Sequence, residues 1–362
     1  MKNVAEFTIR LEQVLGADGK PSGTLPDFAR DAAEVERMYR MMTLCRLFDA
    51  KAINLQRTGR LGTYAPCTGH EATHVGVGAA MRQDDVLCPV YREYGTQLWR
   101  GVTLTEILVY WGGDERGTHF AGPRQDLPWC VPIASQMPIA AGVAMAFKVR
   151  NEPRCAVAYI GDGGTSEGAF YEAMNAAGAQ KLPVVFVVVN NGWAISVPVA
   201  AQTAAQTLAQ KAIAAGIPGV QVDGNDVLGV RSVMESALER ARSGGGPTVV
   251  EALTYRLSDH TTADDATRYR PADELEAAWL REPLLRTRRY LESMGNWDEA
   301  REKSLREDCA AQIESAVRAY QTTPKDSTDA MFDHLFATLP EALEEQKDAA
   351  RRWSSVNGGV GH

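Results

Sequence analysis

The sequence lacks the features that mark several specialised classes of protein. Its six cysteines are scattered and no two form a C-x-x-C pair, which argues against a disulfide framework or structural zinc and suits a reducing compartment. No apolar run reaches the roughly 18 residues of a membrane span. Basic residues do not cluster among aromatic ones, so we expect no nucleic-acid partner. The first residues, MKNVAEFTIRLEQ, resemble neither a secretory signal nor a transit peptide, so we expect a cytoplasmic protein.

The remaining composition is that of an ordinary globular chain. It has 362 residues, 45% of them hydrophobic and 23% charged, with a net charge of −8, enough for a large core. Apolar strands alternate with amphipathic helices, which predicts the α/β class over residues 31–330, beginning with a long helix from Asp31 to about Thr58. Gly and Pro residues predict an extended arm over residues 1–30, and charged helical patterns predict a C-terminal helical extension and tail over residues 331–362.

The strongest local signal lies between Cys155 and Pro198. This stretch contains an apolar strand that ends in Gly161-Asp162-Gly163, then a helix, then a second apolar strand that ends in Asn190-Asn191. A strand-helix-strand unit places its strands parallel and adjacent, so both turns emerge at the carboxyl edge of the sheet, where open α/β sheets bind ligands. Either turn alone could have a purely structural role.

The residue types at this edge suit a magnesium ion that holds a diphosphate. The side chains of Asp162 and Asn191 and the backbone carbonyl of Trp193 offer oxygens of the kind that Mg²⁺ prefers. Gly163 and Gly164 leave backbone N–H groups open to a phosphate, and the next helix directs its amino end to the same place. We therefore expect a magnesium and diphosphate site here.

Two clusters nearer the N-terminus are ambiguous by residue type. His70, Glu71 and His74 could form a metal site, but capping and packing of a helix are favoured because a third ligand is not evident. Tyr91-Arg92 follows a short strand, and arginine binds phosphate in a bidentate manner. Small residues over 139–148 allow either tight internal packing or a contact with another subunit.

The polar loop at residues 256–271 also allows more than one interpretation. His260 lies just past a strand end and by default is an exposed bystander. A phosphate-ester hydrolase that uses Asp162, Asp264 and Asp265 with magnesium is an alternative. It lacks an obvious pair of nucleophile and base.

Several motifs together resemble a known family. They occur in the order seen in alpha subunits of two-subunit 2-oxo acid dehydrogenase decarboxylase components, over roughly residues 30 to 345: YREYG, VPIASQMP, GDGGTSEG, NNGWAISVP, QKAIAAGIPGVQVDGND and YRLSDHTTADDATRYRP. The resemblance implies the thiamine diphosphate-binding fold, a mostly parallel sheet with helices on both faces. It also implies decarboxylation of a 2-oxo acid and transfer of the acyl group to a lipoyl-lysine of an acyltransferase component.

The resemblance also implies a role for individual residues. It assigns magnesium to Asp162, Asn191 and the Trp193 carbonyl. It assigns a catalytic role near the reacting carbon, and a contact with the diphosphate, to His260, which replaces the bystander interpretation. The remaining cofactor contacts that it implies are the diphosphate contacts Gly161, Gly163, Gly164, Tyr91, Arg92 and Arg256 and the aminopyrimidine contacts of the Val131 and Ile133 backbone.

The resemblance further implies that the chain is incomplete as an enzyme. In the family, the glutamate that activates the cofactor comes from a beta subunit, in a heterotetramer of two alpha and two beta subunits. The GGTSEG segment favours pyruvate as the substrate, whereas NNGWAIS and the Thr73–Gly76 run favour branched-chain 2-oxo acids, and acetoin dehydrogenase is a third relative. A non-catalytic thiamine diphosphate-binding scaffold is disfavoured, because the expected site residues are all present together.

Overall fold

The computed structural model describes residues 1–357. Its main sheet has six strands in the order β1-β7-β8-β4-β3-β2, and every neighbouring pair is parallel. The bounds of these strands are Leu11–Glu12 for β1, Val86–Cys88 for β2, Ala156–Gly161 for β3, Val184–Asn190 for β4, Gly219–Asp223 for β7 and Thr248–Leu253 for β8. A small antiparallel hairpin joins β5 (Trp193–Ala194) to β6 (Val197–Pro198). The predicted α/β class with a mostly parallel sheet is confirmed.

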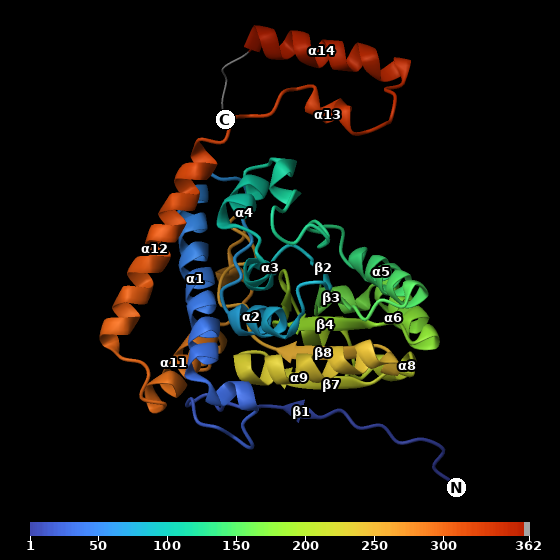
Figure 1. Ribbon diagram of the computed structural model, residues 1–362, viewed down its shortest axis with the longest axis vertical. Coiled ribbons are helices and arrows are strands. Elements are labelled where there is room, and N and C mark those ends of the chain that lie inside the picture. The colour runs from blue at the N-terminus through green and yellow to red at the C-terminus, as the bar shows by residue number, and fades with distance from the viewer. Residues whose placement is uncertain (358–362) are drawn as a thin grey trace.

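Helices connect and surround the strands (Figure 1). Their bounds are Ala32–Arg57 for α1, Glu71–Ala80 for α2, Tyr94–Arg100 for α3, Leu104–Trp111 for α4, Gln136–Arg150 for α5, Gly168–Gln180 for α6, Val199–Gln202 for α7, Lys211–Ala214 for α8, Val227–Arg240 for α9, Ala272–Trp279 for α10, Pro283–Ser293 for α11, Glu299–Gln321 for α12, Ala330–Asp333 for α13 and Glu341–Asn357 for α14. None of the helices within residues 1–357 is both long and apolar enough to cross a membrane.

Alternating side chains of the central strands face two separate apolar clusters. Along β3, Ala158 and Ile160 pack in the cluster that contains residues of α5 and α6. Val157 and Tyr159 pack in the cluster that contains residues of α9. This period of two is what a strand buried on both faces requires, and it confirms the expectation of helices on both faces.

The first thirty residues are more closely packed than expected. Residues Leu11–Glu12 pair with β7, and Leu15 is completely buried. The backbone N–H groups of Val14 and Leu15 donate to Asp226 Oδ2 at 2.6 and 2.8 Å. The expectation that this segment carries no packed element is therefore wrong beyond residue 10, because a distant carboxylate supplies the hydrogen-bond acceptor.

The long helix predicted from Asp31 is α1, whose N-cap is Asp31 itself. Helix α12 packs along α1 in a third apolar cluster. Beyond α12, α13 and α14 lie away from the sheet (Figure 1), joined to each other by the ion pairs Lys347–Asp333 and Arg351–Asp329. The division between an α/β domain at 31–330 and an extension at 331–362 stays a prediction, and residues 358–362 of the predicted tail lie outside the described residues.

Candidate active site

The two turns singled out in the sequence lie side by side. Strands β3 and β4 pair with Gly161 opposite Val189, so Asp162 and Asn191 follow neighbouring strands at one edge of the sheet. Asp162 is 3% exposed and Asn191 is 8% exposed. The prediction that both turns meet at the carboxyl edge is confirmed.

A cavity of about 490 Å³ opens at this edge, a size typical of sites for small ligands and cofactors. Most of the residues that the sequence nominated line it, namely Tyr91, Arg92, Ile133, Gly161, Asp162, Gly163, Gly164, Asn191, Trp193 and His260. Val131 is outside the lining and is 54% exposed. Arg256 is fully buried behind the wall. The structure thus brings together residues that span almost 170 positions of the chain.

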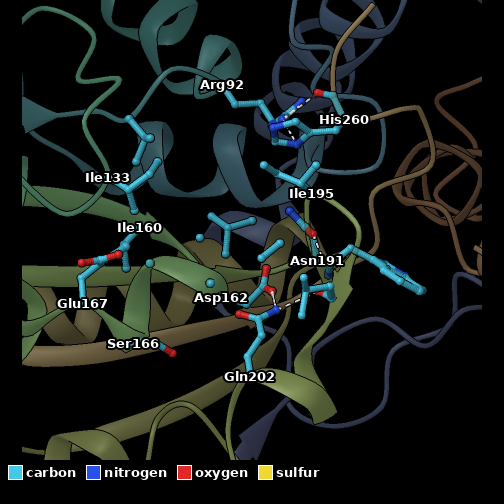
Figure 2. Close-up of a pocket in the computed structure, with 18 of the residues that line it drawn as sticks. Arg92, Ile133, Ile160, Asp162, Ser166, Glu167, Asn191, Ile195, Gln202 and His260 are labelled. Carbon is cyan, nitrogen blue, oxygen red and sulfur yellow. Dashed lines mark hydrogen bonds between the residues drawn. The ribbon is translucent and has the colours of Figure 1, made fainter. Parts of the chain in front are cut away.

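At one end of the cavity, which we call the acidic end, lie Asp162, Asn191 and Gln202 (Figure 2). Burial raises the pKa of the Asp162 carboxyl, and hydrogen bonds from Gln202 and from backbone N–H groups offset part of that effect. Gln202 Nε2 donates to Asp162 Oδ2 at 3.1 Å. A buried carboxylate whose side-chain donor is a neutral amide is well suited to a cation.

The other two oxygens expected to bind magnesium already accept hydrogen bonds. Asn191 Oδ1 accepts from the Trp193 N–H at 3.1 Å, and the Trp193 carbonyl accepts from Arg256 Nη1 at 3.3 Å. An amide or carbonyl oxygen has two lone pairs, so each retains one for a second partner. The donor set therefore fits a hard divalent ion.

The glycines of the first turn differ in what their missing side chains allow. A Cβ on Gly163 would lie 2.4 Å from Ala194 Cβ, and one on Gly164 would lie 2.6 Å from Ile160 Cγ1. These two glycines are therefore required by packing, in addition to the ligand contact expected of them. A Cβ on Gly161 would meet no atom within 4 Å, so the space above it is open to a ligand.

At the other end of the cavity, which we call the basic end, Arg92 and Arg256 converge on His260. Arg256 donates from Nη2 to the Ile195 carbonyl and to the Tyr269 hydroxyl, both at 2.8 Å. Arg92 donates to the Pro66 carbonyl through Nη1 and to the His260 carbonyl through Nη2. Both guanidinium groups also lie 3.3 Å from His260 Nδ1, as the Arg92 and His260 sticks in Figure 2 show.

This geometry fixes the protonation of His260. A guanidinium has donors only, so Nδ1 accepts and the neutral ring carries its proton on Nε2. Burial, together with the charges of Arg92 and Arg256, lowers the pKa of His260 to about 3, against a smaller raising effect of Asp264. The backbone N–H of His260 donates to Asp264 Oδ2 at 2.8 Å. His260 is thus a fixed, neutral group in the cavity wall, and the bystander interpretation is wrong.

The alternative metal sites do not form. In the part of the chain that the structure describes, no three or more His, Cys, Asp and Glu side chains gather closely enough to hold a metal ion. This excludes a cluster of His70, Glu71 and His74. Glu71 instead accepts from the Gly69 N–H at 2.8 Å and pairs with Arg46. No side-chain capping bond forms at the start of α2, so the expected capping role is wrong, whereas the burial of all three side chains agrees with the expected packing role.

The carboxylates of the hydrolase alternative do not come together in the structure. Asp264 and Asp265 are absent from the cavity lining, and Asp264 is occupied by His260 and by the Tyr269 hydroxyl. Asp265 caps a short 3-10 helix by accepting from the Thr267 N–H. Asp264 and Asp265 therefore do not join Asp162 at this cavity, and the three-carboxylate site of the hydrolase alternative does not form.

Several lining residues were missed by sequence reasoning. Gln202 reaches Asp162 only because the β5–β6 hairpin folds back over the turn, and no local motif signals that contact. His70 and Glu93 also line the cavity. Glu93 is part of the YREYG segment and could have been nominated with it, whereas His70 was weighed only as a metal ligand.

Comparison with known proteins agrees with this geometry. The family model described as "Dehydrogenase E1 component" matches residues 39–328. Proteins from Staphylococcus epidermidis and Staphylococcus aureus, each named "Pyruvate dehydrogenase E1 component subunit alpha", are 41% identical to this chain over 348 residues. That alignment covers 95% of this chain and 93% of each relative. The family implies the use of thiamine diphosphate, and the cavity has the donor set and the open space for it. The chain therefore belongs to the dehydrogenase E1 component family.

Proposed function

We propose that this chain is the alpha subunit of a pyruvate dehydrogenase decarboxylase component, which uses thiamine diphosphate and Mg²⁺ and acts together with a beta subunit. The reaction is the oxidative decarboxylation of pyruvate with transfer of the acyl group to a lipoyl-lysine of the acyltransferase component. The observation that carries the proposal is the cavity itself, which has oxygens suited to a cation at one end and the Arg92 guanidinium, with Arg256 buried behind it, at the other. The names of the relatives support pyruvate over branched-chain 2-oxo acids.

Within this proposal the acidic end holds the metal. Asp162, Asn191 and the Trp193 carbonyl supply its protein ligands, and diphosphate and water complete the set. The backbone at Gly161, Gly163 and Gly164 contacts the diphosphate. When bound, thiamine diphosphate supplies the electron sink that makes the loss of carbon dioxide from a 2-oxo acid feasible.

The basic end binds the anionic part of the cofactor and orients His260. Tyr91 and Arg92 reach the diphosphate from the cavity wall, and Arg256 supports the site from behind. His260 holds its proton on Nε2 and can donate it in a hydrogen bond to an oxygen of the ligand without adding positive charge. The backbone of Val131 and Ile133 is assigned to the aminopyrimidine; Ile133 lines the cavity, which supports its part of that assignment.

The beta subunit completes the cavity from outside. Apolar side chains surround the mouth, with Ile133 44%, Ile195 56% and Val197 43% exposed. Exposed apolar groups gathered at one site favour a protein contact. A beta subunit that covers this mouth would exclude water and contribute the missing activating glutamate, and a lipoyl domain would then enter from the remaining opening.

The test is reconstitution of the holoenzyme. The purified chain, alone and with a beta subunit of the same family, is assayed with thiamine diphosphate, Mg²⁺ and an artificial electron acceptor. We expect little activity from the chain alone, and in the reconstituted enzyme a kcat/KM for pyruvate at least about tenfold above that for 3-methyl-2-oxobutanoate. Full activity of the lone chain would contradict the need for a partner, and the opposite preference would contradict pyruvate as the substrate.

A further inference from the structure

Two buried charged side chains are hydrogen-bonded to the two turns of the acidic end without lining the cavity. Lys211, at the start of α8, is 8% exposed, and Glu251, in β8, is completely buried. Charged side chains are seldom buried in this way unless they are paired with an opposite charge. The hydrogen-bond partners of both residues are neutral groups instead. Burial of a charge among neutral partners is costly, so both residues call for an explanation.

Lys211 holds the first turn, which carries Asp162. Its Nζ donates to the carbonyl and to the hydroxyl of Thr165, both at 2.9 Å. Thr165 is completely buried in the short 3-10 helix Gly163–Ser166, and its hydroxyl donates to the Asp162 carbonyl at 2.7 Å. Because the hydroxyl oxygen accepts from the ammonium, its own proton is free to point at Asp162. A single hydroxyl therefore connects the Lys211 charge to the backbone of a proposed metal ligand.

Glu251 holds the second turn, which carries Asn191. Its Oε1 accepts from Asn190 Nδ2 at 2.8 Å, and the Oδ1 atom of the same amide accepts from the Gly192 N–H at 3.3 Å. An ionised carboxylate has acceptors only, so it fixes which atom of the Asn190 amide faces Gly192. Asn191 lies between these two residues, and Glu251 therefore fixes the shape of the turn on both sides of it.

The segment at 209–211 joins the two supports. The Ala209 N–H donates to Glu251 Oε2 at 2.8 Å, and Lys211 follows two residues later. Burial lowers the pKa of Lys211, against a smaller raising effect of Glu251. One short segment thus binds the carboxylate at one turn through its backbone and the carbonyl at the other turn through its side chain.

We infer that Lys211 and Glu251 are positioning residues for the proposed metal site, which hold the Asp162 and Asn191 turns in fixed positions relative to each other. The inference rests on the metal site of the proposed function and deepens it. Mg²⁺ demands nearly ideal octahedral geometry from its ligands, so a small displacement of either turn weakens binding. Groups that orient the ligands of a metal site typically contribute about 10- to 100-fold to its affinity.

Glu251→Gln and Lys211→Met test the two supports separately. The new amide in Glu251→Gln keeps an oxygen for the Ala209 N–H but presents an N–H donor to the Asn190 amide, which then loses its fixed orientation. Lys211→Met retains a long buried side chain and removes the ammonium. Calorimetry of the full chain with inorganic pyrophosphate gives the Mg²⁺ concentration for half-maximal binding, which should rise about tenfold in each variant.

Asp226→Asn is the matched control. Asp226 is a completely buried carboxylate that also holds backbone in place, by accepting from the Val14 and Leu15 N–H groups, and it is absent from the cavity lining. The control should lower the Tm, as the two test variants do, and leave the Mg²⁺ dependence unchanged. An unchanged Mg²⁺ dependence in either test variant, or an equal rise in the control, would overturn the inference.

A second measurement uses the unaltered chain and does not depend on the folding of a variant. If the two supports favour metal binding, metal binding must stabilise the supports in return. Addition of Mg²⁺ and pyrophosphate should therefore slow hydrogen exchange of the Ala209 N–H, held by Glu251, by a larger factor than that of the Val14 and Leu15 N–H groups. Equal factors would mean that the ligand stabilises the whole fold and that the supports are not coupled to the metal site.

The results separate this inference from the proposed function. If the unaltered chain binds pyrophosphate in an Mg²⁺-dependent manner and the two test variants match it, only the positioning role is removed. If the test variants shift the Mg²⁺ dependence but the reconstituted holoenzyme does not decarboxylate pyruvate, only the proposed function is removed. Absence of Mg²⁺-dependent pyrophosphate binding in the unaltered chain would remove both.

Discussion

The two ends of the cavity are built in different ways. The acidic end comes from the ends of two adjacent strands, whose register places Asp162 beside Asn191. The basic end comes from segments far apart in the chain, since Arg92 follows β2 whereas Arg256 and His260 follow β8. The first end is therefore a product of local motif and parallel pairing, and the second depends on the tertiary fold.

The two ends also differ in the hydrogen-bond partners that the protein supplies to their charged side chains. Arg256 has protein acceptors for its Nη1 and Nη2 groups, including the Ile195 carbonyl, while its buried Nε has no partner among the described residues. Ile195 has a φ of +54°, which is unfavourable for a β-branched residue and is retained where the surrounding structure requires it. Asp162 has a neutral amide as its side-chain donor and a pKa raised by burial. The guanidinium groups of the basic end thus have acceptors within the protein, whereas in the proposed function a cation completes the acidic end.

The largest expected effect tests that difference directly. Asp162→Ala should weaken Mg²⁺-dependent binding of thiamine diphosphate by about 100-fold or more, since even indirect supports of a metal site cost about 10- to 100-fold. The free energy of unfolding of the ligand-free variant should stay equal or rise by about 1 kcal/mol, because a costly buried carboxylate has been removed. Calorimetric titration and chemical denaturation measure the two quantities.

Chelation supplies the control for this substitution. Removing Mg²⁺ with EDTA should reduce the affinity of the unaltered chain to that of Asp162→Ala and should change the variant little. If Asp162→Ala binds as tightly as the unaltered chain, or if it destabilises the protein by several kcal/mol, then Asp162 is a structural residue and the contrast between the two ends fails.

The sequence predicts the acidic end, which is built from local motifs, better than the basic end, which is built from distant segments. The strands, the turns and the meeting of Asp162 with Asn191 follow from apolar patterns and from the geometry of parallel strands. Residue type alone made His260 a bystander, because its neutral state depends on Arg92 and Arg256 from other parts of the chain. The contact of Gln202 with Asp162 and the attachment of residues 11–15 to Asp226 were missed for the same physical reason. Each of these contacts joins residues that are far apart in the chain, and no local sequence motif predicts it.

An effect of intermediate size is expected at the basic end, where substitution of His260 should change how the Tm depends on pH. The pKa of His260 is about 3 in the folded chain and about 6.5 in an unfolded one. The unfolded state therefore binds more protons between these values, and the contribution of His260 to stability is lost as the pH falls from 6.5 towards 3. His260→Gln removes this titration and keeps an acceptor for the two arginines. Its Tm should consequently fall less steeply with acid than that of the unaltered chain.

Comparing the unaltered chain with His260→Gln separates the pH-dependent contribution of His260 to stability from contributions of other groups that have the opposite sign. Burial raises the pKa of Asp49 to about 6 and that of Glu93 to about 7, so both groups favour the folded state at lower pH. They are present in both proteins and cancel in the difference. Identical slopes for the unaltered chain and His260→Gln between pH 6.5 and 4 would mean that His260 is not held neutral, and the basic end would then lack the fixed donor described above.

The smallest effect is expected at the residue that touches the acidic end without belonging to its ligand set. Gln202 Nε2 donates to Asp162 Oδ2 and also, at 2.9 Å, to the Val197 carbonyl. Gln202→Leu removes one hydrogen bond to the Asp162 carboxylate and one to a backbone carbonyl, but it leaves the proposed metal ligands in place, so the Mg²⁺ concentration for half-saturation should rise by only about three- to tenfold. Magnesium-independent binding of sulfate at the basic end should be unchanged. A loss as large as that of Asp162→Ala would show that the amide and the carboxylate act as one hydrogen-bonded unit. In that case the acidic end would be as complete within the protein as the basic end, and a cation would no longer be needed to explain the burial of Asp162.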